Sequence, residues 1–373
     1  MQEKDNNPVP QIKDIISVLE KLAPPSYQEV YDNAGLLTGN ANDEVKGVLL
    51  CLDSTEKAID EAIANNCNMV VAHHPIIFSG LKRITGKTYV ERAVIKAIKN
   101  DVAIYAIHTN LDNVLHGVNK MICERLGLIN ASILLPKSNL LKKLVTFAPT
   151  DHAEKVRNAL FGAGAGHIGA YSHCSFNTTG MGTFMAGKDA TPYVGEKEKL
   201  HTENEVRIEV VFESRKEGEI ISRLLQNHPY EEVAYDIYGL ANKLNNVGSG
   251  MVGELPEAMP EKEILLMLKK NMQAAVVKHT NLRGKPVKKV AVCGGAGIFL
   301  LQEAIRQGAD VFITSDIKYH EYFDADGKIV LADIGHYESE QFTAQLIMNE
   351  LKNNFSTFAL RLTNIVTNPV NYL

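Results

Sequence analysis

Apolar runs that each end in histidine or acidic residues are the feature that most constrains the fold of this 373-residue chain. In the first part of the chain these runs are Val45–Leu52, Met69–Ala72 and Ala103–Ile107, and segments with helical periodicity separate them. Short runs that are apolar at almost every position favour strands buried on both faces, as in parallel sheets. Strands that alternate with helices indicate right-handed βαβ connections. The sequence therefore predicts an α/β fold with parallel strands.

Three helices are expected around these strands. An amphipathic pattern covers Ile12–Leu22 and must end before Pro24, because proline cannot continue a helix. A second helix is expected over Thr55–Asn66, where Thr55 can cap the first turn, and a third over about Val90–Asn100.

The C-terminal part of the chain repeats this plan. The segment VKGVLLC at Val45 resembles VKKVAVC at Val287, and both begin an apolar run. Extending this alignment without a gap sets His73-His74 opposite Ser315-Asp316.

A second alignment sets His108 on His336 and Asp112 on Glu340, so both halves carry His-x-x-x-acid after an apolar run. We therefore expect an internal duplication of one α/β half. Two independent parallel sheets that share generic βαβ patterning are the alternative.

A different pattern separates the two halves. Its order is strand, helix, strand, strand, helix, strand, which is typical of a ferredoxin-like α+β module. The predicted strands are Leu141–Phe147, Cys174–Ala186, Glu205–Glu213 and Val233–Leu240, with helices ending at Phe161 and covering Lys216–Gln226. The expected domains are residues 1–139 for the N-terminal half of the core, 140–245 for an inserted module and 246–373 for the C-terminal half of the core.

Composition excludes several classes of protein. The chain is 45% hydrophobic and 22% charged, and no apolar run approaches the roughly 20 residues of a membrane helix. Its start, MQEKDNNPVP, lacks the basic-then-apolar pattern of a secretory signal, so a cytosolic location is expected. A net charge of −5 makes nucleic acid an unexpected partner. The five cysteines form no CxxC pair and are expected to be buried thiols.

Histidines and acidic residues gather at the predicted ends of parallel strands. The carboxyl ends of such strands meet at one crevice of an open α/β sheet, so these side chains should converge. Neighbouring histidines on a regular strand point to opposite faces, and they can share a site only where Pro75 turns the strand into a loop. The candidate metal ligands are His73, His74, Asp112, His336 and Glu340.

The residue types in this set suit a pair of metal ions. His336 and Glu340 are four residues apart and share a face if a helix begins there. Three histidines and two carboxylates favour Zn, Fe, Mn or Co over Ca or Mg, and a glutamate can bridge two ions. A structural, hydrogen-bonded role is the alternative for each histidine taken alone.

Other groups near the predicted site are candidates for catalysis. His108 ends the strand that leads to Asp112, and can support a metal ligand or shuttle a proton. Asp316 and His320 lie where the duplication places the counterpart of His74, and are candidates for substrate contact or acid/base work. The run Gly294–Gly297 can cradle a phosphate at a helix start, but its spacing favours a tight turn.

Four motifs resemble the Nif-three-like family, also called GTP cyclohydrolase I type 2 homologues. They are YDNAGLLTG, VVAHHPIIFSG, IHTNLDN and IGHYESEQ. The resemblance implies that the five candidate ligands hold two divalent metal ions and that the chain forms a toroidal homohexamer. It also implies that the middle module is a PII-like or CutA-like insertion, with HPYEEVAYDIY as its most specific stretch. Tyr31 stands where the family usually begins its first motif with tryptophan, so the chain departs from the family at this position.

Two main functions fit these features. The first is a metal-dependent hydrolase that acts on a nucleotide or a phosphoester through activated water, and the family name would make the substrate GTP. The second is a non-enzymatic metal-binding or regulatory hexamer whose insert senses a small molecule. A third, a DNA-encircling ring, is disfavoured by the acidic net charge.

Overall fold

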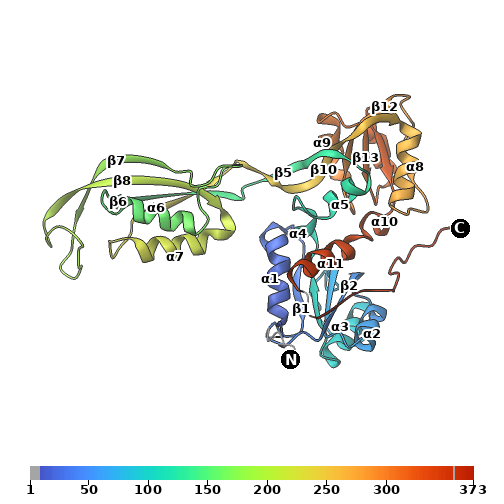
Figure 1. The fold of residues 1–373 in the computed structure, drawn as a ribbon, viewed down its shortest axis with the longest axis horizontal. Coiled ribbons are helices and arrows are strands. Elements are labelled where there is room, and N and C mark those ends of the chain that lie inside the picture. The colour runs from blue at the N-terminus through green and yellow to red at the C-terminus, as the bar shows by residue number, and fades with distance from the viewer. Residues whose placement is uncertain (1–8, 356–357) are drawn as a thin grey trace, which may run out of the picture. The chain divides into compact units, whose positions relative to one another are not determined.

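The computed structural model describes residues 9–355 and 358–373, which form two compact units (Figure 1). The first unit comprises the described residues of Met1–Pro136 and Asn246–Leu373, and the second comprises Lys137–Asn245. The boundaries expected from the sequence are residues 140 and 245. Most of the polar start of the chain, on which the expected location depends, lies at residues 1–8, outside the described residues.

The first sheet of the first unit is mixed, with a parallel centre. Strands β15, β2, β3 and β4 are parallel to their neighbours, and β1 is antiparallel to β4 at the edge. The order across the sheet is β1 (Gly35–Thr38), β4 (Ala103–Ala106), β3 (Met69–His74), β2 (Gly47–Asp53) and β15 (Ala359–Leu362).

Helices cover both faces of this sheet (Figure 1). Its strands are therefore buried on both sides, which explains why their sequences are apolar at consecutive positions. The Thr55 hydroxyl accepts a hydrogen bond from the Ala58 N–H and so caps α2. One face is covered by α2 (Glu56–Ala64) and α3 (Tyr89–Lys99), the other by α1 (Ile12–Leu22) and α11 (Thr343–Asn354).

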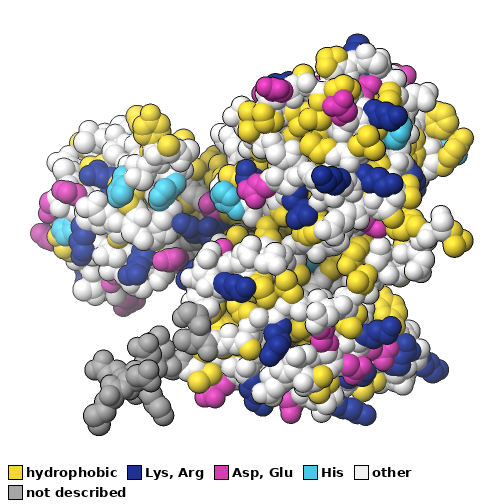
Figure 2. All heavy atoms as spheres, turned by 45° about the vertical axis from the view of Figure 1, so that its right-hand side comes forward, with side chains coloured by type: hydrophobic (Ala, Val, Ile, Leu, Met, Phe, Trp, Pro, Cys, Tyr) yellow, Lys and Arg dark blue, Asp and Glu magenta, His cyan; other side chains and the backbone are white. Residues whose placement is uncertain are grey.

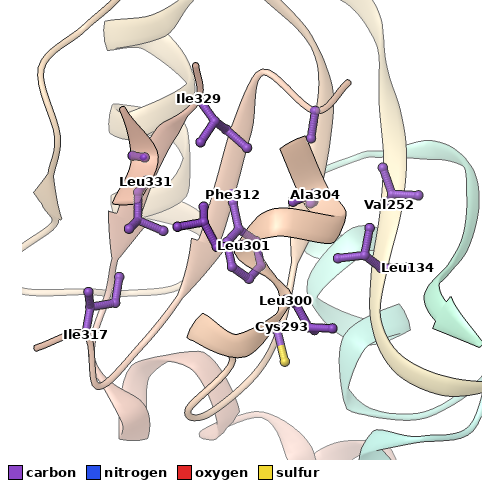
Figure 3. Close-up of a cluster of buried hydrophobic side chains, with 13 residues drawn as sticks. Leu134, Val252, Cys293, Leu300, Leu301, Ala304, Phe312, Ile317, Ile329 and Leu331 are labelled. Carbon is purple, nitrogen blue, oxygen red and sulfur yellow. The ribbon is translucent and has the colours of Figure 1, made fainter. Parts of the chain in front are cut away.

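The second sheet also has a parallel centre, formed by β12, β13 and β14. Strands β10 and β11 are antiparallel to their neighbours. Figure 3 shows the buried cluster on one face, where Leu301 and Ala304 of α9 (Leu301–Arg306) lie beside Phe312 and Val252. The order is β11 (Lys278–His279), β14 (Val330–Asp333), β13 (Val311–Thr314), β12 (Pro286–Val292), β10 (Lys243–Pro260) and β5 (Ile129–Ser138).

The two sheets share one order of elements. Helix α1 precedes β1, β2, α2, β3, α3 and β4, and α8 (Glu261–Asn271) precedes β11, β12, α9, β13 and β14, with a 3-10 turn in the place of α3. Strands β3 and β13 begin at Met69 and Val311, which are opposite each other in the ungapped alignment of the two halves. The final strand of each half pairs in the other sheet, because β5 lies beside β10 and β15 lies beside β2.

The expectation of parallel strands is confirmed at the centre of each sheet, but each sheet also contains antiparallel pairs. In the second sheet the antiparallel partner of β12 is the long strand β10, which contains Gly248-Ser249-Gly250. A long antiparallel strand carries no helix crossover, so the βαβ pattern could not reveal it.

The remaining helices of the first unit are α4 (Thr109–Asp112), α5 (Val118–Arg125) and α10 (His336–Glu340), with short 3-10 turns at Pro25–Tyr27, Ile298–Leu300 and Tyr319–Ala325.

The second unit has one antiparallel sheet and two helices on one face of it (Figure 1). Its own buried cluster includes Leu144, Val156, Ile208 and Leu224, all within the unit. The strand order is β7 (Phe176–Met185), β8 (Leu200–Glu213), β6 (Leu141–Pro149) and β9 (Tyr235–Leu240), and the helices are α6 (Ala153–Gly162) and α7 (Glu217–Asn227) after a 3-10 turn at Ser214–Lys216. Along the chain the order is βαββαβ.

No helix among the described residues combines the length and hydrophobicity needed to cross a bilayer. Figure 2 shows basic and acidic side chains interspersed on the face in view. Cys51, Cys67, Cys123 and Cys293 are buried, as expected from their sequence context, and Cys174 is half-buried.

Candidate metal centre

The five candidate ligands lie together at the strand ends of the first unit. His73 and His74 are the last residues of β3, Asp112 ends α4 after β4, and His336 and Glu340 begin and end α10 after β14. Ring nitrogens and carboxylate oxygens within 4.8 Å of one another define three overlapping groups. These are His74–His336–Glu340, His73–Asp112–Glu340 and His73–His74–His108.

Glu340 lies between the two neighbouring histidines. Its Oε2 is 3.0 Å from Nε2 of His74, and its Oε1 is 3.9 Å from Nε2 of His73. Both histidines belong to β3, which ends at His74 immediately before Pro75, where the sequence predicts that the strand gives way to a loop. They share the site because the two oxygens of Glu340 reach one ring each, and the ring centroids are 4.9 Å apart. Oxygen Oε2 is also 3.1 Å from Nε2 of His336.

The Nδ1 atoms of the β3 histidines are held by groups outside the cluster. Nδ1–H of His73 donates to the carbonyl oxygen of Ile107 at 2.8 Å, and Nδ1–H of His74 donates to Oδ1 of Asp53 at 2.8 Å. Asp53 ends β2 and pairs in register with His74. Each Nε2 is thereby directed to the cluster, which is the arrangement that fixes metal-binding histidines.

The other two histidines are held in the same way. Nδ1–H of His108 donates to Oδ1 of Asp32 at 2.7 Å, and Nδ1–H of His336 donates to Oδ2 of Asp316 at 2.6 Å. Asp32 also accepts from the backbone N–H and the hydroxyl of Thr109. Thus three carboxylates and one backbone carbonyl orient four imidazoles.

Two buried atoms of the cluster have no hydrogen-bond partner among the described residues. They are Nε2 of His73 and Oδ1 of Asp112, and they lie 3.7 Å apart. Buried polar atoms nearly always have a partner, so this pair needs one. A lone-pair nitrogen and a carboxylate oxygen that face the same space are a donor set that fits a metal cation.

Burial and neighbouring charges shift the pKa values of the cluster residues in different directions. Burial lowers the pKa of His73 to about 4, although Glu340 opposes the shift, so its Nε2 keeps a free lone pair at neutral pH. Burial also disfavours charge on His74 and His336, but nearby carboxylates raise the pKa of His74 to about 9 and that of His336 to about 11. Burial and the negative charge of Glu340 raise the pKa of Asp112. The histidines around Glu340 outweigh its burial and lower its pKa.

A glycine turn allows Glu340 to approach the backbone. Gly295 has a φ of 63°, and a Cβ atom there would lie 2.5 Å from Oε1 of Glu340. The N–H groups of Gly294 and Gly295 donate to side chains of Asn119 and Ser339. Side chains of the protein therefore use these N–H groups, in agreement with a tight turn rather than a phosphate cradle.

Two cavities meet at the cluster. One of about 400 Å³ is lined by His74, His108, Asp112, His336 and Glu340, with aromatic rings of Tyr31, Phe78 and Phe299 in its wall. The other, of about 610 Å³, contains His74, His336 and residues of the C-terminal segment. The first cavity leaves room for a ligand beside the cluster.

The three candidate catalytic residues lie at different places relative to the cluster. His108 lies close enough to His73 and His74 to share a ligand with them, and Asp316 contacts the cluster through His336. His320 is not brought to the cluster, since the 3-10 turn after β13 carries it to the surface, where its ring packs beside Tyr319. It lines neither cavity at the site.

Asp32 and Asp53 are functional residues that the sequence patterns did not predict. Asp53 could have been found, because it ends the strand next to β3 and strand ends converge. Asp32 lies in the YDNAGLLTG motif, but nothing in its spacing pointed to His108. Its role depends on the contact between two distant segments.

Comparisons with known proteins agree over nearly the whole chain. A family model described as Duf34/NIF3 (NGG1p interacting factor 3) matches residues 10–369. A Bacillus subtilis relative named "GTP cyclohydrolase 1 type 2 homolog" is 39% identical over 365 residues, covering 96% of this chain and 98% of that protein. A relative of the same name from Halalkalibacterium halodurans is 40% identical over 325 residues, covering 86% and 87%.

Solved structures give the same result. A Bacillus cereus protein related to NIF3 superposes with a TM-score of 0.85 at 37% identity, covering 98% of this chain and 100% of that one. A Staphylococcus aureus protein superposes with a TM-score of 0.77 at 29% identity, covering 98% and 99%. The sequence, the fold and the family match together show that the chain belongs to the Duf34/NIF3 family.

Proposed function

We propose that the chain is a hydrolase that binds two divalent metal ions through His73, His74, Asp112, His336 and Glu340, and that it acts on a nucleotide or a phosphoester. The observation that carries this proposal is the pair of buried atoms without partners, Nε2 of His73 and Oδ1 of Asp112. A cation between them would satisfy both atoms and offset the buried charge of Glu340.

The donor set supports two ions rather than one. The oxygens of Glu340 face different histidines, so this side chain can bridge two positions, one nearer His73 and Asp112 and the other nearer His74 and His336. Mixed imidazole and carboxylate ligands suit Zn, Fe, Mn or Co. When bound, such ions lower the pKa of water towards neutrality and polarise the group that is attacked.

The remaining residues have roles in position and proton transfer. His108, held at Nδ1 by Asp32, can hold or accept a proton at Nε2 on the cavity side. Asp316 orients His336, and Asp53 orients His74. The aromatic wall of the 400 Å³ cavity fits a planar group, and the name of the curated relatives makes GTP the first nucleotide to test.

Metal analysis and an activity screen test this proposal. The protein is purified without oxygen, its metals are measured, and nucleotides and phosphoesters are screened for hydrolysis in solvent labelled with heavy oxygen. We expect close to two ions per chain, label in the product in a single turnover, and loss of activity in Asp112→Asn but not in Asp60→Asn, an exposed carboxylate in α2. Full activity of metal-free protein, or label that first enters a protein side chain, would exclude the mechanism.

One observation favours a second function, a metal-binding or regulatory assembly in the cytosol. The middle unit has its own core and a βαββαβ order, which supports a PII-like or CutA-like ferredoxin-like module. Such an assembly would be the toroidal hexamer that the family resemblance implies. Light scattering would give the mass of the oligomer, and metal binding without turnover of any screened compound would favour this function over the hydrolase.

A further inference from the structure

The second unit contains a cavity of about 390 Å³ whose walls all come from that unit. It lies at the end of β7, around Gly182–Met185, and beside Glu205 of β8. The segment after α7, around Tyr230–Glu232, closes another side, and Tyr193 of the β7–β8 connection contributes a further wall. This cavity is unrelated to the metal cluster, because it shares no residue with the cavities there.

Aromatic rings form much of its wall. The ring of Tyr230 has its centroid 6.2 Å from that of Phe184 and 6.2 Å from that of Tyr193. Both pairs are tilted rather than stacked, so the rings do not cover one another's faces. The imidazoles of His201 and His152 lie 5.3 Å from Phe184 and Tyr193 respectively, outside the lining itself. Phe184, Tyr193 and Tyr230 therefore place unstacked aromatic rings in the wall of the cavity.

The charge of the cavity is negative. Oε1 of Glu205 accepts a hydrogen bond from the Tyr230 hydroxyl at 2.9 Å, and its Oε2 lies over Gly182, where a Cβ atom would be 2.1 Å away. Glu231 and Glu232 also line the cavity, and Glu231 accepts from the backbone N–H of Thr191 at 2.7 Å. Lysine and arginine do not occur among the lining residues, all of which belong to the described chain.

The imidazole of His228, next to Tyr230, does not cancel this charge. Burial lowers the pKa of His228, whose Nδ1 accepts the Tyr230 backbone N–H, so that imidazole is neutral near pH 7. Anionic ligands such as nucleotides are usually bound by lysine or arginine side chains. The wall of this cavity contains neither residue. Aromatic faces combined with carboxylates are the surroundings that recognise organic cations.

We propose that this cavity of the second unit binds a small organic ammonium cation. The aromatic rings of Phe184, Tyr193 and Tyr230 attract the positive group, and Glu205 supplies the opposite charge in the cavity wall. The Tyr230 hydroxyl keeps Glu205 in place, and Gly182 provides the space for its carboxylate. Occupation of this site needs no metal and no hydrolysis, so the inference stands independently of the proposed hydrolase.

Calorimetric titration of the full chain with three probes tests the proposal. The probes are choline, tetramethylammonium, and 3,3-dimethyl-1-butanol, which has the shape of choline without its charge. We expect both cations to bind and the neutral alcohol to bind about tenfold more weakly, the effect of about 1.4 kcal/mol from cation–π and carboxylate contacts. Equal binding of the alcohol, or no binding of either cation, would overturn the proposal.

Matched variants locate the site. Glu205→Gln removes the charge and keeps the shape, and Phe184→Leu removes a π face; each should weaken choline binding about tenfold. Glu209→Gln makes the same change on the same strand outside the cavity and should leave affinity unaltered. Thermal unfolding shows whether each variant folds. If Glu205→Gln does not fold, Tyr193→Leu gives the same test, because the Tyr193 ring is 52% exposed and its loss should not disturb the core. Unchanged affinity in the folded cavity variants, or equal weakening in Glu209→Gln, would overturn the assignment.

Discussion

The two sheets of the first unit place chemically different residues at equivalent strand ends. Strand β3 ends in His73-His74, and both rings enter the cluster directly. The equivalent positions after β13 are Ser315 and Asp316, and Asp316 reaches the cluster only through Nδ1 of His336. A shared order of strands thus delivers side chains to one place, while residue type decides whether they contact a ligand or orient another residue.

The helices that follow β4 and β14 differ less. Helix α4 follows His108 and ends at Asp112, and α10 begins at His336 and ends at Glu340. A separate aspartate accepts a hydrogen bond from Nδ1–H of each histidine. Glu340 nevertheless occupies the centre, since its two oxygens face three histidines, whereas Asp112 faces His73 alone at comparable distance. The second half therefore contributes the carboxylate that would bridge the two ions of the proposed site, and the first half contributes most of the nitrogen atoms.

The largest expected effect follows from this asymmetry. Glu340→Ala should lose both metal ions, because one side chain serves both positions. Elemental analysis after anaerobic purification measures the content, and Glu263→Ala, an exposed glutamate at the start of α8, is the control. Full metal content in Glu340→Ala would contradict the five-residue assignment.

Positioning carboxylates from the two halves can be compared directly. Asp53→Asn and Asp316→Asn should each lower metal affinity by about 10- to 100-fold, since each fixes the ring of one ligand. Competition with a chelator gives the affinities. A loss confined to Asp53→Asn would show that the second half orients His336 by other means, and the difference between the halves would be larger than proposed.

The glycine turn beside Glu340 offers a stability test with an internal control. Gly295→Ala should lower the free energy of unfolding by roughly 1–3 kcal/mol, because the added Cβ meets both an unfavourable positive φ and the Glu340 carboxylate. Gly327→Ala has nearly the same φ, 64°, with no atom near the added Cβ, and isolates the backbone part. Equal losses in the two variants, measured by denaturant unfolding, would remove the contact with Glu340 from the explanation.

The pH dependence of the metal-free chain tests the charge distribution. A histidine whose pKa is raised on folding stabilises the fold below its ordinary pKa, and this contribution disappears as pH rises through the folded value. For His74, raised to about 9, stability should fall between about pH 6.5 and 9. Thermal unfolding across this window should show the decline in the metal-free chain and less of it in Asp53→Asn. Metal binding in the same window should release protons, so affinity should rise with pH.

The smallest effect is expected from removing the second unit. Replacing residues 140–245 with a short Gly/Ser join should leave a folded core with its full metal content. The ends to be joined are close, since a Cβ at Gly248 would lie 2.2 Å from the carbonyl oxygen of Leu135, and the second unit buries its own cluster. An insoluble product, or one without metal, would show that the first unit depends on the second.

Sequence patterns by themselves determined the parallel centres of both sheets and the residues at their strand ends. Met69 and Val311 begin matching strands because buried parallel strands must be apolar at successive positions, and that signal survives without any knowledge of contacts. The same logic selected His73, His74, Asp112, His336 and Glu340. The motifs around them pointed to the family that the comparisons show.

Only the tertiary structure decided which residues act together across the fold. The hydrogen bonds from His74 to Asp53 and from His108 to Asp32 join residues far apart in sequence. His320 lies away from the predicted site because a 3-10 turn carries it to the surface. The antiparallel strand β10, the exchange of β5 and β15 between sheets, and the aromatic cavity of the second unit likewise depend on distant pairings. Local periodicity reports burial along one segment, whereas such pairings are set by the packing of segments that the pattern treats separately.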